Sequence, residues 1–333
     1  MTANDIAILG TGTAMPQTVL HSQELDERYK KPSGWFLRHS GVAQRHVCTH
    51  ETASELAANA ARMALSAAKL DARDIDAIIS ATAVPEQPIP AMAPLVQQHL
   101  GLAAEGTPAF DINSSCLSFL TACDLASAWI GVGRAQRVLV VSSEVSSRGL
   151  PWRDDPATAA LFGDGAAAAV IGRAEAPAPS RFVAAAMQTF SQGYRFCELG
   201  SGGTRFDYRQ EREAFEEHTT FKMDGRAVYG LTAKVIRPFL DGLLDKAKWT
   251  VADIDWIVPH QASRGALDHI VKFLHIPKPK VIDILANSGN QIAASLPSAL
   301  HEAIASGRMK RGDKVLMVGT SAGLSVGGIA LVY

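Results

Sequence analysis

The sequence predicts an α/β protein in which sheets are covered by helices and one structural unit is present twice. Short apolar runs rich in Val, Ile and Ala alternate along the 333 residues with longer stretches of helical periodicity. This alternation is typical of parallel sheets packed against helices. Three sequence blocks also recur in the same order at a nearly constant offset, which indicates an internal duplication.

Seven short runs are predicted to be buried strands, because they are apolar and rich in Val, Ile and Ala. These strands are expected at 6–9, 75–81, 138–142, 166–171, 254–258, 315–318 and 329–332. The segments between them carry apolar residues at helical spacing. These helices are expected at 53–68, 90–100, 117–130, 227–241, 263–274 and 294–305.

The recurring blocks lie 177 or 179 residues apart. They are DIDAII at 74–79 and DIDWIV at 253–258, NSSCLS at 113–118 and NQIAAS at 290–295, and RVLVV at 137–141 and KVLMV at 314–318. We therefore predict two similar halves, 1–173 and 180–333, joined by the polar, Pro- and Ala-rich segment 172–180. Because like halves usually pack about a pseudo-twofold axis, the equivalent loops that carry Cys116 and Asn290 are predicted to meet.

Charge and hydropathy exclude several classes of partner. The chain has 32 Lys and Arg against 33 Asp and Glu, for a formal net charge of -1. Nucleic-acid binding normally needs a basic excess, so no nucleic-acid partner is expected. The sequence has no uncharged apolar run of about 18 residues, so we expect no membrane span.

The four cysteines, Cys48, Cys116, Cys123 and Cys197, are scattered and form no C-x-x-C pair. Neither a metal site nor a disulfide framework is therefore expected. The N-terminal sequence lacks the features of a signal peptide, and a reducing cytoplasm is the expected compartment. Three of the cysteines are interpreted as structural, and the fourth, Cys116, stands in a different setting.

Cys116 follows a short predicted strand and a Ser-rich turn, and it precedes a helix. Unpaired N–H groups and the helix dipole at such a position favour the thiolate, which is the nucleophilic form of cysteine. The segment alone is equally compatible with a small buried core residue, which is the usual role of a free cysteine.

His260 and Asn290 occupy comparable positions in the second half. His260 comes directly after a buried strand and Pro259, at the carboxyl end of the strand, where ligands bind in α/β sheets. Asn290 lies in a Gly-Asn turn before a helix. Each residue alone is also compatible with a structural turn, and Asn287 is a nearby rival more typical of a turn residue.

Two Gly-rich segments have different expected roles. The segment 162–165 (FGDG) is predicted to be a tight turn in which the Asp164 side chain accepts hydrogen bonds from turn amides. The segment 319–328 follows a late strand and could supply backbone N–H groups to an oxyanion hole. The segment 10–14 lacks the third glycine and the acidic residue of a dinucleotide-binding fingerprint, so a nicotinamide or flavin cofactor is not expected.

Taken together, these segments resemble the β-ketoacyl-acyl-carrier-protein synthase III family of the thiolase superfamily. The matching segments lie, in the family's order, around Cys116 and at 162–165, 256–262, 289–297 and 319–328. Trp35, the segment 41–46 and the segment 221–226 match as well, so that the likeness runs from about Ile6 to Tyr333.

The resemblance implies a thiolase-like, five-layered α-β-α-β-α fold, a homodimer and a decarboxylating condensation. Cys116 would take an acyl group from a CoA or acyl-carrier-protein thioester. His260 and Asn290 would then hold a malonyl thioester and stabilise the enolate that attacks the acyl-cysteine. The backbone N–H groups of Cys116 and Ala322 would form the acyl oxyanion hole. The thioesters are substrates, and no separate cofactor or metal is implied.

The same resemblance assigns substrate contacts and an interface. The expected substrate-binding residues are Trp35, Arg38, Ile89, Phe162, Arg226, Ser263 and Arg264. The Pro-rich loop 85–94, with Ile89 and Met92 near its centre, is expected to enter the partner's acyl channel and limit chain length. Dimers of the family associate through this loop and through a sheet edge, which we expect near 138–142.

The chain departs from the family pattern in three places, two single residues and one three-residue motif. His39 and Pro156 stand where housekeeping members carry arginine, and Ser263, Arg264 and Gly265 replace an Asn-x-Arg motif. In the family these positions hold the adenine and phosphates of CoA or contact the carrier protein. The departures therefore predict a specialised member with a different acyl donor or acceptor.

The sequence is compatible with three functions. The first is decarboxylating condensation, as in fatty acid or polyketide biosynthesis. The second is transfer of the Cys116-bound acyl group to a hydroxyl, amine or thiol. The third is a non-catalytic partner subunit of another synthase, against which the intact set of Cys116, His260 and Asn290 argues.

Overall fold

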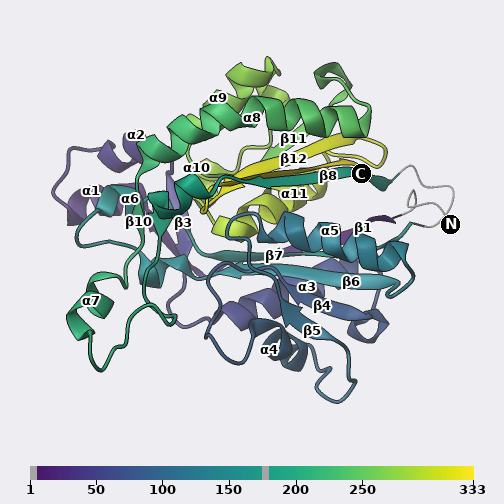
Figure 1. Cartoon of the computed structure of the whole chain (residues 1–333), viewed down its shortest axis with the longest axis horizontal. Helices are drawn as coiled ribbons and strands as arrows, with labels where there is room; N and C mark the ends of the chain where they lie inside the picture. Colours follow the sequence, from purple (N-terminus) through teal and green to yellow (C-terminus); the bar gives the residue numbers. More distant parts are fainter. Residues whose placement is uncertain (1–5, 175–179) are drawn as a thin grey trace.

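The computed structural model describes residues 6–174 and 180–333, and two main sheets organise them (Figure 1). The first sheet has the strand order β1 (Ile6–Ala14), β7 (Gly165–Arg173), β6 (Arg137–Glu144), β4 (Ala77–Ser80) and β5 (Ala109–Asp111). The second has the order β11 (Trp256–Pro259), β12 (Lys314–Ser321), β13 (Ser325–Val332) and β8 (Arg181–Thr189).

The second sheet repeats the first. The order β4-β6-β7-β1 in the first sheet corresponds to β11-β12-β13-β8 in the second, and the strands of each recurring sequence block occupy equivalent places. The duplication that the sequence predicts is therefore confirmed. The division at 1–173 and 180–333 stays a prediction, because much of the joining segment 172–180 lies outside the described residues.

Both sheets are mixed, which corrects the expectation of parallel sheets. The pairs β4–β5, β4–β6 and β11–β12 are parallel, whereas β6–β7, β7–β1, β12–β13 and β13–β8 are antiparallel. The physical reason is clearest at β12 and β13. Only the residues 322–324 separate these strands, and so short a connection can form a hairpin but not a parallel crossover.

Six longer helices complete a five-layered α-β-α-β-α arrangement, as predicted (Figure 1). The helices α3 (Ala53–Ala68) and α4 (Met92–His99) pack on the outer face of the first sheet. The helices α8 (Gly225–Ala247) and α9 (Arg264–Leu274) pack on the outer face of the second. Between the sheets lie α5 (Ser118–Gly131) and α11 (Ser295–Ala305), in a core cluster that contains residues of both halves.

Small residues let these layers approach closely. At Gly12 in β1, an added Cβ would lie 2.4 Å from the carbonyl oxygen of Ala60 in α3. The facing helix carries buried alanines at 57, 60, 61 and 64. The Ala- and Gly-rich composition therefore corresponds to direct contact between helix and sheet backbones.

The remaining elements surround the ends of the sheets. They are two short antiparallel strand pairs, β2 (Thr18–His21) with β3 (Gln44–Val47) and β9 (Cys197–Glu198) with β10 (Lys222–Met223), and the helices α1 (Ser22–Arg28), α2 (Trp35–Ser40), α6 (Pro156–Ala159), α7 (Arg212–Glu217) and α10 (Leu285–Ser288). The helix α7 projects from the body of the molecule (Figure 1). Within the described residues, no helix has the length and apolar character needed to cross a membrane.

Two details of the expected interface are wrong. The strand β6, which contains 138–142, lies inside the first sheet between β7 and β4, and the edge on that side is β5. Met92 is the first residue of α4 and is 2% exposed within its own chain, so it is not free to reach a partner. Ile89, by contrast, is 87% exposed.

Candidate active site

A strained turn presents Cys116 ahead of α5. Ser115 has a φ of 52°, a left-handed conformation that is uncommon for a residue other than glycine. The Asn113 side chain stabilises this turn, because it accepts the Ser115 N–H at 2.9 Å and donates to the Ala83 carbonyl at 3.0 Å. Cys116 therefore reaches the cavity two residues before the helix begins at Ser118.

Burial controls the ionisation of Cys116. It raises the pKa of the thiol to about 12, and the negative charge of buried Glu144 acts in the same direction. The backbone N–H groups of Cys116 and Ala322 lie near the sulfur and lower the pKa, but by less. The expectation of a stabilised thiolate is therefore wrong for the unloaded site. The contact with the Ala322 N–H fits the expected oxyanion hole.

Glu144 is a buried acid that no sequence motif singles out. Its side chain is fully buried, and its two oxygens accept the N–H groups of Ala83 and Val84 at 2.7 and 3.1 Å. Burial raises the pKa of this carboxyl to about 8, against those hydrogen bonds. Glu144 thus anchors the start of the Pro-rich loop beneath the nucleophile.

His260 is the first residue after β11 and points into the same cavity. Its backbone N–H donates to the Val318 carbonyl at 2.8 Å, which places it beside β12. The side chain is 6% exposed, and its Nδ1 atom has no hydrogen-bond partner among the described residues. Burial lowers the pKa of His260 to about 4, so the imidazole is neutral at pH 7.

The backbone and side chain of Asn290 are both fixed. Its N–H donates to the Leu161 carbonyl at 2.8 Å, and its own carbonyl accepts the Gly163 N–H at 3.1 Å. The side-chain oxygen accepts the Ile292 N–H at 2.8 Å, which leaves the amide nitrogen as the available donor. That nitrogen makes one long contact of 3.4 Å, with the Ala262 carbonyl.

The predicted turn at 162–165 is what holds the Asn290 loop. Asp164 is fully buried and accepts the Cys48 N–H at 2.8 Å, the Ser147 N–H at 2.9 Å and the Ser147 hydroxyl at 2.6 Å. Asp164 therefore accepts backbone amides, but these belong to Cys48 and Ser147 and not, as the sequence predicted, to its own turn. The chain can then pair Phe162 with Asn290 across the two halves.

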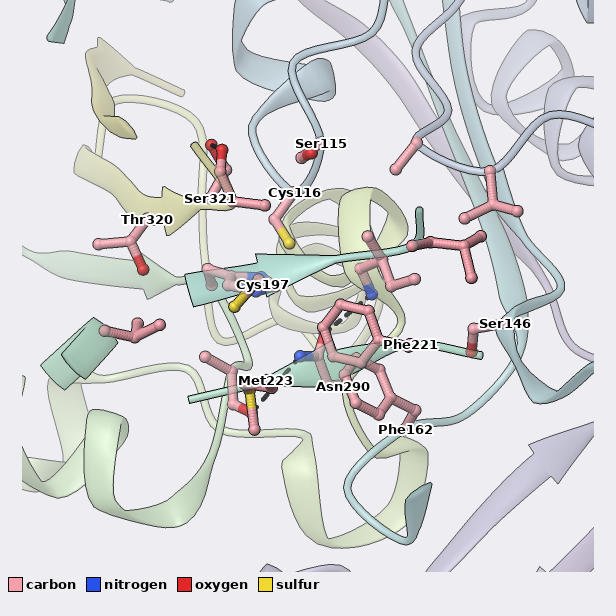
Figure 2. Close-up of a pocket in the computed structure, with 18 of the residues that line it drawn as sticks. Ser115, Cys116, Ser146, Phe162, Cys197, Phe221, Met223, Asn290, Thr320 and Ser321 are labelled. Atoms are coloured by element: carbon pink, nitrogen blue, oxygen red, sulfur yellow. Dashed lines mark hydrogen bonds between the residues drawn. The ribbon is translucent and has the colours of Figure 1, made fainter. Parts of the chain in front are cut away.

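Cys116, His260 and Asn290 all line one cavity of about 1190 Å³, so the tertiary structure brings the three predicted residues together. Cys116 comes from the first half, and the other two come from the second. Figure 2 shows Cys116 and Asn290 in the cavity. Ala322, Phe162 and Ser263 also line this cavity. The described residues contain no cluster of three or more His, Cys, Asp or Glu side chains that could hold a metal ion.

The other predicted substrate contacts lie outside the cavity wall. They are Trp35, Arg38, Ile89, Arg226 and Arg264. The Trp35 ring stacks on His39 with centroids 3.8 Å apart, and the Arg264 guanidinium forms an ion pair with Asp283 through both terminal nitrogens. Their contact with a substrate remains a prediction.

Sequence reasoning missed several wall residues, above all Cys197, which was interpreted as structural. Cys197 lies in the two-residue strand β9 and lines the cavity, as do Phe221 and Met223 (Figure 2). A two-residue strand has no detectable periodicity, so the sequence held no signal for Cys197. The match of 221–226 to the family was the only indication for Phe221 and Met223.

Comparisons with known proteins agree on one family over the whole chain. Family models match residues 110–190, described as 3-oxoacyl-[acyl-carrier-protein (ACP)] synthase III, and residues 244–333, described as the C-terminal part of the same enzyme. Curated relatives include the β-ketoacyl-[acyl-carrier-protein] synthase III of Neisseria meningitidis serogroup C and that of Laribacter hongkongensis. Each is 36% identical over 98% of this chain and 98% of its own length.

Solved structures give the same result. The 3-oxoacyl-[acyl-carrier-protein] synthase III of Aquifex aeolicus superimposes with a TM-score of 0.88 at 32% identity, covering 98% of this chain and 100% of its own. The corresponding enzyme of Thermus thermophilus has a TM-score of 0.87 at 30% identity, with 98% and 99% covered. Both comparisons support the five-layered fold described above.

Proposed function

The chain belongs to the 3-oxoacyl-[acyl-carrier-protein] synthase III family, and on this premise we propose that it condenses an acyl thioester with a malonyl thioester through Cys116. The observation that carries the proposal is the pair of neutral donors opposite the thiol. His260 is neutral because it is buried, and the Asn290 amide is oriented by the bonds to its oxygen. Neutral, fixed donors are suited to an oxyanion that develops during the reaction.

In the first half-reaction, the Cys116 sulfur attacks the carbonyl carbon of the acyl thioester. The carbonyl oxygen becomes an oxyanion, which the N–H groups of Cys116 and Ala322 would stabilise. The tetrahedral intermediate then collapses, the C–S bond to the donor breaks, and the donor leaves as a free thiol. Because the pKa of Cys116 is raised in the unloaded site, its proton must leave as the attack proceeds, and the departing thiolate of the donor takes it up.

In the second half-reaction, a malonyl thioester would place its carbonyl oxygen against His260 and Asn290. Loss of carbon dioxide leaves the bonding electrons as an enolate whose oxygen both residues stabilise. The enolate carbon then attacks the acyl-cysteine, a C–C bond forms, the C–S bond to Cys116 breaks, and the Cys116 thiolate takes a proton from solvent to become the thiol. Asn290 has no evident task in simple acyl transfer, and this favours condensation over transfer to a hydroxyl, amine or thiol.

The substrates would be CoA or acyl-carrier-protein thioesters, and no cofactor beyond them is proposed. A homodimer remains part of the proposal, as in the resemblance, and so does a cytoplasmic location. The four cysteines are free, which supports a reducing compartment.

The experiment that tests the proposal separates the two half-reactions. Asn290→Ala should leave Cys116 acylation, measured by intact-protein mass spectrometry, nearly unchanged. It should slow release of labelled carbon dioxide from a malonyl thioester by about 100- to 1,000-fold, the usual effect of removing one oxyanion donor. Asn287→Ala is the matched control, since Asn287 is exposed and only three residues away.

His260→Ala should impair the same step, and the double variant should be little worse than either single, because the two donors act as a unit. Wild-type protein that acylates on Cys116 but never decarboxylates a malonyl or substituted malonyl thioester would instead support the transfer reaction. Wild-type protein that no thioester acylates would support a non-catalytic subunit.

A further inference from the structure

The cavity continues well past the nucleophile. Its wall extends from α8 and α9, with Tyr229 and Phe273, to the segment 83–88 at the start of the Pro-rich loop. Figure 2 shows Cys116 between Thr320 on one side and Ser146 on the other. One side must admit the arm that carries the thioester. Phe162 and Phe221 lie on the side toward Ser146 (Figure 2), so this side is the more suited to an apolar acyl group.

The total volume, about 1190 Å³, exceeds the range of about 300–1,000 Å³ typical of pockets that enclose a drug-sized ligand. An acetyl group has only three heavy atoms and would leave most of the inner part to water. Water beside an acyl-cysteine is unfavourable, because closed sites protect reactive intermediates from hydrolysis by excluding it. An isoleucine side chain from a second copy would fill only a fraction of this space.

The inner wall is built for an apolar group. Phe162 and Phe221 pack edge to face with ring centroids 5.4 Å apart, and both line the cavity with Leu150 and Val145. The Phe221 N–H donates to the Gly149 carbonyl at 2.9 Å, which holds this aromatic pair against the turn that follows β6. The wall is therefore rigid and apolar.

Two small side chains, Cys197 and Ser146, also line the cavity. Cys197 pairs with Met223 in the β9–β10 ladder, so the direction of its side chain is fixed. Its thiol is close enough to the Cys116 thiol for their charges to interact, and Figure 2 shows both sulfurs in the same cavity. Ser146 lines the cavity as well, and its hydroxyl is within 3.3 Å of an Asp164 oxygen. Each side chain has only two heavy atoms.

We propose that Cys197 and Ser146 make room for an acyl group larger than acetyl, and that they select an apolar chain of at least about four carbons, or a branched or aromatic group, on Cys116. This inference rests on the proposed function and specifies its acyl substrate. A leucine at either position would add two heavy atoms beside the thioester. A pocket changed by a single methylene discriminates between substrates by about 10- to 200-fold.

The test uses full-length protein and simple N-acetylcysteamine thioesters, so that recognition of CoA or a carrier protein does not enter. Acylation of Cys116 is followed by intact-protein mass spectrometry with acetyl, butyryl, isobutyryl, hexanoyl and benzoyl donors. Wild type should prefer hexanoyl or benzoyl over acetyl by at least about 10-fold in rate at subsaturating donor. Equal or faster acylation by acetyl would overturn the inference while leaving the proposed function in place.

The variants test whether Cys197 and Ser146 set the preference for larger acyl groups. Cys197→Leu and Ser146→Leu should each lower the hexanoyl-to-acetyl ratio by about 10- to 100-fold, and Cys197→Ala, which removes the thiol without filling space, should keep the wild-type order of donors. A ratio unchanged in both leucine variants, with folding verified by circular dichroism, would overturn the assignment. If a leucine variant does not fold, the hexanoyl-to-acetyl ratio is measured with Cys197→Met instead. Failure of every donor to acylate wild type would refute the proposed function itself.

Discussion

Burial favours the neutral form of both titratable groups at the reaction centre. It raises the pKa of Cys116 to about 12 and lowers that of His260 to about 4. A charged cysteine–histidine pair is therefore disfavoured in the unloaded site, in contrast to cysteine enzymes in which the thiolate exists before substrate binds. Neutral His260 can donate a hydrogen bond to an enolate, because the neutral imidazole keeps one N–H group.

At this scale, Cys116→Ala should abolish the acyl-enzyme while leaving the fold unchanged. The substitution removes only the sulfur from a half-buried position, and no other element depends on the thiol. Intact-protein mass spectrometry measures the adduct, and circular dichroism checks the fold. An adduct that persists in the variant, for example on Cys123, would show that another thiol is the nucleophile.

The lowered pKa of His260 predicts an unusual pH profile. Neutral histidine persists until the pH falls to about 4, instead of 6.5, so the decarboxylation rate constant should be flat from about pH 5.5 to 8. Stability should fall as the pH drops from 6.5 towards 4, because the unfolded chain binds a proton that folded His260 does not. Single-turnover release of labelled carbon dioxide measures the first effect. If the decarboxylation rate constant instead changed near pH 6.5, both in wild type and in Asn290→Ala, this prediction would be contradicted.

At the scale of elements, the close approach of neighbouring strands fixes the position of His260. The parallel strands β11 and β12 bring Gly319 against His260, where an added Cβ would lie 2.7 Å from the histidine Cβ. It would also lie 3.2 Å from a Leu117 methyl group. The β12 strand therefore packs directly against His260 and limits where its imidazole can lie. Among the residues that the structure describes, none makes a hydrogen bond with its Nδ1 atom.

Gly319→Ala should consequently displace His260 and slow decarboxylation by about 10- to 100-fold, since small misplacements of a catalytic group cost about that much. Acylation of Cys116 should change less. Gly230→Ala is the matched control, because its Cβ would meet open space and alanine favours the α8 helix by about 0.5–1 kcal/mol. Gly319→Ala with wild-type decarboxylation would exclude this role for β12.

At the scale of the molecule, the first sheet ends on one side in β5, a strand of only three residues. An unpaired strand edge can pair with another chain. Near it, the Pro-rich loop exposes Ile89, whose side chain a partner could cover. These features support association through β5 and the loop, in place of the edge at 138–142.

We predict a dimer at micromolar concentration in analytical ultracentrifugation. Ile89→Asp should weaken it by at least about 10-fold, the cost of about 1.4 kcal/mol, because a carboxylate would be buried without a partner. Val132→Asp is the control, since Val132 is 81% exposed but caps α5 outside the loop. A wild-type protein that sediments only as a monomer would refute the expected interface.

The sequence by itself determined the fold class and the duplication, and its resemblance to a family singled out the three central residues. The reason is local: periodicity reports which face of an element is buried, and the repeat offset relates the loops of Cys116 and Asn290 without any coordinates. His260 was identified because a strand end is visible in the sequence. The position of α3, Ala53–Ala68, was also predicted to the residue, since its apolar spacing is a local signal.

Only the tertiary structure decided the ionisation of Cys116, the place of β6 inside its sheet, and the wall residue Cys197. Desolvation depends on atoms that distant segments bring around a group, and strand neighbours depend on pairing across the whole sheet. Cys197 faces the nucleophile because the β9–β10 ladder closes over the cavity. No spacing within the chain encodes that contact, because it forms only when two segments more than 80 residues apart pack together.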